Sequence, residues 1–195
     1  MEIIIHKINS IKDLKLINHK YGVEIDIRSF GSDLILNHDP FQSGERLEDY
    51  LDNYSHGTLV LNIKEAGIEN HVIKLIEERK YIDSYFLLDI EFPYLFKASR
   101  KGQKNLAVRF SEDESIEIAK NYIDMVKWVW IDTITKFPIN ENNVKILNHF
   151  KKCLVCPERW EREHDIIKYK NLIKRKDIKI DAVMTSLKFA KLWLK

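Results

Sequence analysis

The chain has 195 residues, 45% of them hydrophobic, which is enough to bury one sizeable core without disulfide bonds. Its 32 Lys and Arg residues nearly balance its 30 Asp and Glu residues, and the formal net charge of +2 provides no broad basic field to bind a nucleic-acid backbone. We therefore expect a single domain over residues 1–195 and no nucleic-acid partner.

The first residues, Met1–His6, lack the basic leader and the long apolar core of a signal peptide. No apolar run in the sequence is long enough to span a bilayer, so we expect no stable membrane insertion. A cytoplasmic location is the expectation that follows. The sequence favours no particular oligomeric state.

Short apolar runs alternate with amphipathic helical stretches, which is the pattern of repeated βα units and of a parallel sheet. Strands are predicted at Ile3–Lys7, Val23–Arg28, Leu59–Lys64, Tyr85–Ile90, Leu106–Phe110, Trp128–Thr133, Cys153–Pro157 and Asp181–Thr185. Helices are predicted at Ser10–Lys20, Glu69–Lys80, Asp113–Ile123, Asn140–Phe150, Glu161–Lys176 and Leu187–Leu194. About eight strands close a barrel. The predicted fold class is therefore α/β, a compact (β/α)8 TIM barrel.

One extra piece follows the second predicted strand. Gly31–Asp33 is a turn signal, and the segment Leu34–His38 comes directly after it, so the two predict an appended hairpin. We see no low-complexity linker or composition break, and we expect no large inserted subdomain.

Two cysteines, Cys153 and Cys156, have the spacing of a CxxC motif. An apolar strand between them would point the two side chains to opposite faces, and no second Cys or His pair has matching zinc spacing. We expect two buried thiols rather than a zinc or redox site.

Acidic residues gather on one face of the second predicted strand. Because side chains alternate along a strand, Glu24 and Asp26 share a face with Arg28, and the apolar residues between them face the other way. A close carboxylate pair flanked by Ile is electrostatically costly unless a cation lies between the two groups. We therefore expect a metal site in preference to a solvated pair.

Two of the seven histidines lie at strand ends beside these acids. They are His6, after the first strand, and His38, after the hairpin. An imidazole exchanges protons near neutral pH, so we expect catalysis in preference to a packing role. The third predicted strand adds Asn62 and Lys64, which share one face at its carboxyl end.

Polar residues end several other predicted strands as well. The carboxyl ends of the strands are where barrel enzymes carry their sites, although any strand that runs into a solvated loop ends in polar residues. We expect five residues to contact the substrate, namely Lys7, Lys64, Asp89, Arg109 and Glu158.

Taken together, these motifs resemble a known enzyme family. The pattern is Glu-x-Asp at Glu24–Asp26, His-Asp about a dozen residues later at His38–Asp39, and His6 closing the first strand. Ile180–Ser186 is similar to the last strand of the same family. The chain resembles the glycerophosphodiester phosphodiesterases, within the phospholipase-C-like phosphodiesterases, nearly from end to end.

The resemblance implies a TIM-barrel hydrolase of phosphoric diesters acting on a small-molecule phosphodiester. In this family a divalent cation contacts acidic ligands and a phosphate oxygen while two histidines transfer protons, which implies His6 and His38 as catalytic residues. Lys64 would neutralise charge on the phosphoryl oxygens. Hard oxygen donors suit Mg²⁺ or Ca²⁺ better than zinc. The implied metal ligands are Glu24, Asp26 and Asn62.

The chain departs from the family at two motifs. The family usually has His-Arg-Gly where this chain has His6, Lys7 and Ile8, so an ammonium replaces a guanidinium. It typically has Glu-x-Lys where this chain has Asn62, Ile63 and Lys64, so an amide replaces a carboxylate. The alcohols on the phosphate stay open among a glycerophosphodiester, a lysolipid and a diester in a surface-polysaccharide pathway.

Two other function classes stay open. The departures are typical of a binding or regulatory barrel that has lost activity but still holds a phosphate ligand. A barrel could also use Lys64 as a Schiff-base amine in a sugar-phosphate aldolase or isomerase. We disfavour the second, because it does not account for the two histidines and the acid pair together.

Overall fold

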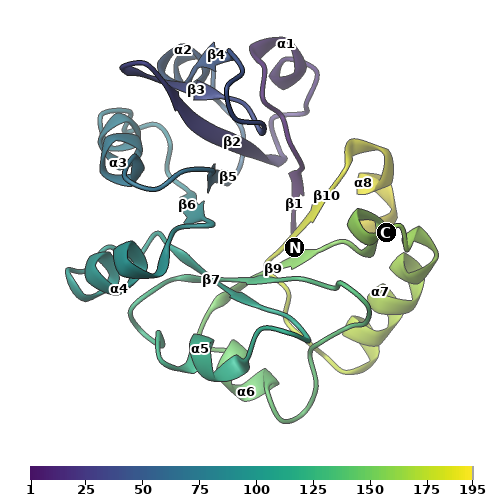
Figure 1. Ribbon diagram of the computed structural model, residues 1–195. Coiled ribbons are helices and arrows are strands. Elements are labelled where there is room, and N and C mark those ends of the chain that lie inside the picture. The colour runs from purple at the N-terminus through teal and green to yellow at the C-terminus, as the bar shows by residue number, and fades with distance from the viewer. Residues whose placement is uncertain (195) are drawn as a thin grey trace. The chain divides into compact units, whose positions relative to one another are not determined.

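The computed structural model describes residues 1–194, which divide into two compact units (Figure 1). The N-terminal unit is Ile4–Phe96, and the C-terminal unit is Met1–Ile3 with the chain from Lys97 onward. The single domain expected over residues 1–195 stays a prediction.

The sheet of the N-terminal unit carries the two buried acids. Its strands run in the order β4-β3-β2-β1, while β5 pairs with β2 and β6. Strands β1, β2, β5 and β6 form parallel ladders, and β3 and β4 pair antiparallel. The strands are β1 (Glu2–Ile5), β2 (Gly22–Phe30), β3 (Asp33–Leu36), β4 (Glu45–Arg46), β5 (Leu59–Ile63) and β6 (Tyr85–Leu88).

Short helices accompany these strands, namely α1 (Ile11–Leu14), α2 (Leu47–Asp52), α3 (Glu69–Glu77) and α4 (Phe92–Arg100), the last of which begins in this unit. Ser10 caps helix α1, because its hydroxyl accepts the Asp13 N–H at 3.0 Å. It is shorter than predicted. The chain turns instead at Asn18, whose backbone oxygen accepts the Tyr21 N–H at 2.9 Å.

Strand β2 is buried on both faces through residue 27, which explains its composition. Ile25 and Ile27 are fully buried on one face, and Glu24 and Asp26 are buried on the other. The β2–β5 register places Asp26 opposite Asn62. The fold therefore brings the polar residues of two neighbouring strands together.

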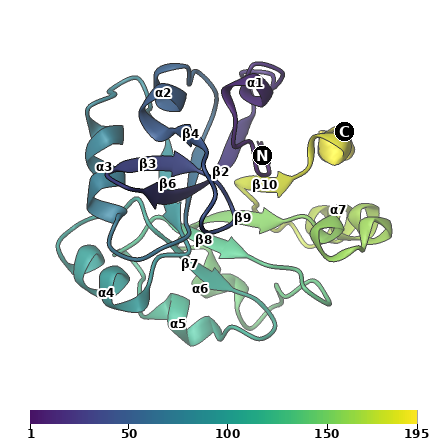
Figure 2. The same cartoon turned by 45° about the horizontal axis from the view of Figure 1, so that its top comes forward.

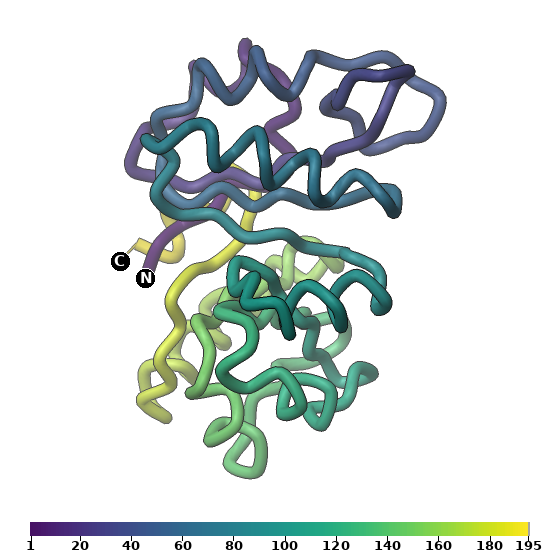
Figure 3. Tube along the Cα trace, turned by 90° about the vertical axis from the view of Figure 1, so that its left-hand side faces the viewer, coloured from purple at the N-terminus to yellow at the C-terminus, as the bar shows by residue number. Residues whose placement is uncertain are grey.

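The hairpin predicted after the second strand is confirmed as β2–β3, and it continues into β4. Gly31 has a φ of +64° in the connecting turn, a conformation that favours glycine. Gly44 meets the strand so closely that a Cβ there would lie 2.2 Å from the Leu36 backbone oxygen. Figure 1 shows β2, β3 and β4 together with α2, and Figure 3 traces the hairpin at one end of this unit.

The C-terminal unit has a parallel sheet in the order β10-β9-β8-β7 (Figure 2). Its strands are β7 (Ala107–Phe110), β8 (Trp128–Ile131), β9 (Lys151–Val155) and β10 (Ala182–Thr185). Its α-helices are α5 (Ile116–Lys120), α6 (Val144–Leu147), α7 (Ile166–Arg175) and α8 (Ala190–Trp193), and its 3-10 helices are η1 (Pro157–Trp160), η2 (Glu163–Asp165) and η3 (Leu187–Phe189).

The two cysteines are buried thiols, as expected, and form no disulfide. The indole N–H of Trp193 donates to the Cys156 sulfur at 3.2 Å, which holds α8 against the segment that follows β9. Burial raises the pKa of the Cys156 thiol to about 12. Both thiols therefore act as core residues.

The predicted α/β class is confirmed, and all eight predicted strands lie in parallel ladders among residues 1–194. Their closure into a barrel stays a prediction. Two helices, α2 and α4, were not predicted. Within residues 1–194 we find no helix whose length and apolarity would let it cross a membrane.

A stacked pair of histidines lies in the N-terminal unit. The His19 and His56 rings are 4.5 Å apart, and His56 Nε2 lies 3.1 Å from the Ile17 backbone oxygen, to which it donates. His56 Nδ1 is buried and has no hydrogen-bond partner among the described residues. Burial lowers the pKa of His56, so the fold disfavours its protonated form.

The His56 environment predicts a loss of stability in acid. An unfolded histidine titrates near pH 6.5, so below about that pH the unfolded chain binds a proton that native His56 resists, and the free energy of unfolding falls as the pH falls. His56→Gln, whose amide can donate to Ile17, should reduce this loss. We expect a smaller drop in melting temperature between about pH 7.5 and about pH 5.5 than in wild type. The exposed His71→Gln should behave like wild type; an equal drop in all three proteins would contradict the idea.

Candidate functional site

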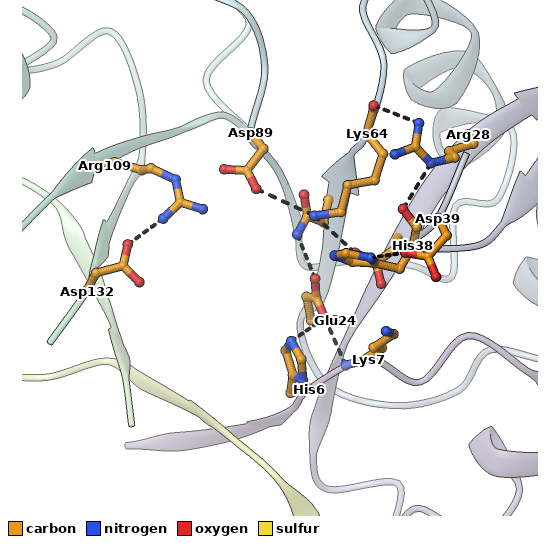
Figure 4. Close-up of polar contacts among 12 residues, drawn as sticks. His6, Lys7, Glu24, Arg28, His38, Asp39, Lys64, Asp89, Arg109 and Asp132 are labelled. Atoms are coloured by element: carbon orange, nitrogen blue, oxygen red, sulfur yellow. Dashed lines mark hydrogen bonds and ion pairs between the residues drawn. The ribbon is translucent and has the colours of Figure 1, made fainter. Parts of the chain in front are cut away.

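The centre of the candidate site is the carboxyl group of Glu24, which is 1% exposed. Its Oε1 accepts the Asn62 side-chain N–H at 2.8 Å, and its Oε2 accepts the Lys7 backbone N–H at 2.8 Å. His6 Nε2 lies 3.8 Å from the same Oε2, within reach of an ion pair when the ring is protonated. Three segments of the N-terminal unit therefore meet at this carboxyl group (Figure 4).

The charge of Glu24 is only partly compensated. Burial, followed by the negative charge of Asp26, raises the pKa of Glu24 to about 7. The hydrogen bonds from Asn62 and Lys7, and the charge of Lys64, act in the opposite direction. Near neutral pH the two acids can therefore be stabilised by one more positive charge, either a proton or a metal ion.

Asp26 is held by a reciprocal pair of hydrogen bonds with Asn9. The Asn9 side-chain N–H donates to Asp26 Oδ2 at 2.8 Å, and the Asp26 backbone N–H donates to Asn9 Oδ1 at 2.8 Å. This arrangement fixes both the backbone and the carboxylate of Asp26. Asn9 was not predicted as part of the site, because nothing in its spacing marks it as a partner of a residue so far along the chain.

Lys64 brings a positive charge to the acids. Its ammonium lies 3.2 Å from Asp26 Oδ1 and 3.8 Å from Asp89 Oδ2.

Asp89 has a φ of 58°, and Lys7 has a φ of 57°, both in the left-handed region that residues other than glycine rarely adopt. Strained backbone of this kind clusters at functional sites, and here it occurs at two strand ends of one site.

His38 lies on the loop that follows β3 and is half exposed. Its Nδ1 is 2.8 Å from Asp39 Oδ1, and this hydrogen bond holds the pKa of Asp39 below its usual range. An ionised carboxylate accepts the proton of Nδ1–H, which leaves Nε2 for chemistry. The loop that carries His38 is also tied to β2 by its backbone, because the Asn37 N–H donates to the Asp26 backbone oxygen at 3.1 Å.

Arg28 is a second residue that the sequence analysis left without a role. Its Nε donates to the His38 backbone oxygen at 3.0 Å, and its Nη1 donates to the Lys64 backbone oxygen at 3.1 Å (Figure 4). The signal was present in the strand alternation, which places Arg28 on the face of Glu24 and Asp26.

The three residues expected to hold a metal supply two carboxylates, from Glu24 and Asp26, and one amide, from Asn62. Across residues 1–194 the structure contains no group of three or more His, Cys, Asp or Glu side chains that could hold a metal ion. Even so, Asn62 Oδ1 is buried without a hydrogen-bond partner among those residues, and Glu24 lacks full compensation. A hard cation would satisfy both, so the chemistry of these donors fits Mg²⁺ or Ca²⁺.

Two predicted substrate-binding residues belong to the C-terminal unit. Arg109 forms an ion pair with Asp132 and lies over the Trp130 ring. Glu158 Oε1 accepts hydrogen bonds from the Thr185 hydroxyl and the Ser186 N–H, each at 2.8 Å. These contacts tie neighbouring strand ends together. The roles of Arg109 and Glu158 toward a substrate stay predictions.

The N-terminal unit itself joins most of the predicted site by direct contacts. This unit holds two groups of direct contacts, one of His6, Lys7 and Asn62 around Glu24 and one of Asp26, Lys64 and Asp89. Together they combine an imidazole, a lysine ammonium and two buried carboxyl groups. Such a set can transfer protons and stabilise negative charge on a bound oxyanion.

No protein-family model matches the sequence, and neither does any curated protein. Among solved structures, the chain is similar to a glycerophosphodiester phosphodiesterase from Agrobacterium tumefaciens str. C58, with a TM-score of 0.67 and 11% identity over 94% of this chain and 96% of that one. It is also similar to a glycerophosphoryl diester phosphodiesterase from Parabacteroides distasonis ATCC 8503, with a TM-score of 0.65 and 13% identity over 94% of this chain and 81% of that one. The chain therefore has the fold of solved glycerophosphodiester phosphodiesterases, the family that its motifs resemble.

Proposed function

We propose that this protein is a metal-dependent phosphodiesterase that hydrolyses a glycerophosphodiester-like substrate by two-histidine acid and base catalysis. The observation that carries the proposal is the pair of buried acids on β2, of which Glu24 contacts His6 and Asn62 and Asp26 pairs with Lys64. The fold of solved phosphodiesterases supports the same reaction class.

The histidines carry the proton transfers in this proposal. One imidazole accepts a proton from the attacking water, and the other donates a proton to the leaving alkoxide. Proton exchange with the solvent then returns both rings to their starting states. The hydrogen bond that His38 Nδ1–H donates to Asp39 supports His38 as one of the two, because it orients the ring. The proximity of Glu24 supports His6 as the other, since the carboxylate stabilises its imidazolium form.

The reaction also needs positive groups that stabilise the negative charge on the phosphoryl oxygens. Lys64 supplies one ammonium, held in place by Asp26 and Asp89. Glu24, Asp26 and Asn62 would hold Mg²⁺ or Ca²⁺, and the bound ion would supply the positive charge that polarises a phosphoryl oxygen. Asn9 keeps Asp26 oriented whether or not the ion is bound.

A second candidate is a barrel that binds a phosphate ligand without turning it over. It is favoured by one observation, namely that the Asn62 amide donates to Glu24 where the resembled family has a third carboxylate. A screen against glycerophosphodiesters, lysophospholipids and a chromogenic aryl phosphodiester, each with Mg²⁺, Ca²⁺ or a chelator, separates the two. Ligand binding without release of a phosphomonoester would favour the binding barrel.

The first mutational prediction concerns the histidines. His6→Ala and His38→Ala should each lower kcat on the order of a hundredfold or more, because each removes a group that transfers a proton. Folding should be little affected, since His38 is half exposed and neither ring belongs to the apolar core. The measurement is steady-state hydrolysis of the best diester from the screen, with the melting temperature recorded for each variant.

His149→Ala provides the matched control, because His149 is an exposed histidine that follows α6. It should keep the kcat of wild type. If His6→Ala or His38→Ala also keeps that kcat on the true substrate, the residue concerned has no part in the reaction.

The second mutational prediction concerns metal affinity. Asn62→Asp replaces an amide by a carboxylate of the same size next to Glu24, so without a cation the added repulsion should lower the melting temperature. With a cation, the extra charge should tighten Mg²⁺ or Ca²⁺ binding by about tenfold or more. Calorimetric titration of the metal alone into both proteins measures the difference.

Asn143→Asp is the control, because Asn143 is also a buried amide but belongs to the C-terminal unit. It should lose stability without any change in metal affinity. Equal metal affinities for wild type and Asn62→Asp would remove Asn62 from the ligand set.

A further inference from the structure

The strand that carries the two acids ends in a side chain that reaches two other segments. Arg28 donates through Nε to the His38 backbone oxygen at 3.0 Å and through Nη1 to the Lys64 backbone oxygen at 3.1 Å. Figure 4 shows the guanidinium next to both residues. A single side chain thus links β2 to the backbones of the proposed proton-transfer residue and the proposed phosphate-binding residue.

Both carbonyl groups lie just beyond the regular ladders of the sheet. The β2–β5 ladder ends at Ile27 and Ile63, and the next backbone bond runs from the Lys64 N–H to the Ile27 oxygen at 3.0 Å. The Lys64 oxygen then accepts from the Arg28 side chain. Beyond the end of the β2–β5 backbone ladder, the Arg28 side chain therefore still connects the two strands.

The loop of residues 37–44 has little else to hold it. Every residue from His38 to Gly44 is exposed, including Phe41 at 95%, so no apolar side chain anchors the loop in the core. Two of its hydrogen bonds are internal, from the Asn37 side chain to the Ser43 oxygen and from the Asp39 N–H to Asn37 Oδ1, each at 2.9 Å. The position of His38 thus depends on the hydrogen bonds that tie the loop to β2, namely that of the Asn37 N–H and that of Arg28.

We propose, on the basis of the phosphodiesterase function proposed above, that Arg28 is a positioning residue that holds His38 and Lys64 at a fixed separation. A guanidinium suits this task, because its planar fork presents several N–H donors in fixed directions and can satisfy two carbonyls at once. A lysine at this position has the same charge but a single donor atom. Arg28 acts through the two residues that it orients, without touching the reacting atoms.

The experiment compares Arg28→Lys with wild type in two measurements. Hydrogen–deuterium exchange of the peptide covering residues 37–44 should become faster by about tenfold, because the loop loses a tie to the strand. The kcat on the aryl phosphodiester should fall by about tenfold to a hundredfold, since a small displacement of a catalytic group has an effect of that order. KM should stay within about twofold of wild type, as expected for a residue that does not contact the substrate.

Arg46→Lys is the matched control, because Arg46 belongs to the same hairpin but is half exposed and pairs with Asp33 and Glu48. It should change neither the exchange nor kcat. Arg28→Gln serves as a second variant, because it keeps an amide donor and loses the charge; it should also free the loop, and it carries both measurements if Arg28→Lys does not fold.

Two results would overturn the inference. A raised KM with unchanged kcat and unchanged exchange would make Arg28 a substrate contact, and no change in any measurement would make it a bystander. The exchange measurement does not need turnover. If wild type hydrolyses no diester, the proposed function fails while faster loop exchange in Arg28→Lys still supports the positioning role, so the two failures are distinguishable.

Discussion

Two carboxyl groups that lie two residues apart on β2 are both almost fully buried, and this burial sets the requirements for everything around them. A buried carboxylate loses its hydration, and a second one beside it adds repulsion, so each needs hydrogen-bond donors or a cation. The strand register and the loops of the N-terminal unit supply those donors from four positions. They are the Lys7 N–H, the Asn9 side chain, the Asn62 side chain and the Lys64 ammonium.

Parallel strands deliver these donors because their carboxyl ends lie at the same edge of the sheet. The loops then add what the strands cannot. Asp89 directly after β6 and Lys7 two residues after β1 adopt left-handed backbone conformations, and the conformation of Lys7 accompanies the donation of its N–H to Glu24. Gly44 lets the loop that carries His38 return against the Leu36 backbone at a distance that no side chain would allow. The strained backbone of Lys7 and Asp89 thus accompanies the convergence of charged groups in the site.

Much of this arrangement could be predicted from the sequence, because periodicity reports strands well. The alternation of polar and apolar residues identified β2 and the shared face of Glu24 and Asp26. The turn signal at Gly31 identified the hairpin. Long-range partners could not be predicted. The clamp of Asn9 on Asp26 and the bonds of Arg28 to two carbonyls depend on how loops return to the sheet, which no local pattern records. Helix ends were also overestimated, as at α1, where amphipathic composition continues past the point at which the chain turns.

The two departures from the resembled family both change the charge near the buried acids. An amide at position 62 carries no negative charge to the proposed cation site, and an ammonium at Lys7 keeps one positive charge without a guanidinium's fork. Fewer carboxylates weaken the attraction for a divalent ion, yet Glu24 still has a pKa raised to about 7, so its charge is not fully compensated. A proton and a cation are therefore alternative ways to neutralise the same pair of acids, and the proton must leave Glu24 before a cation can gain the full attraction of both. Under the proposed function, this competition would make metal binding more responsive to pH than in a site with three carboxylates, which would hold the cation more tightly.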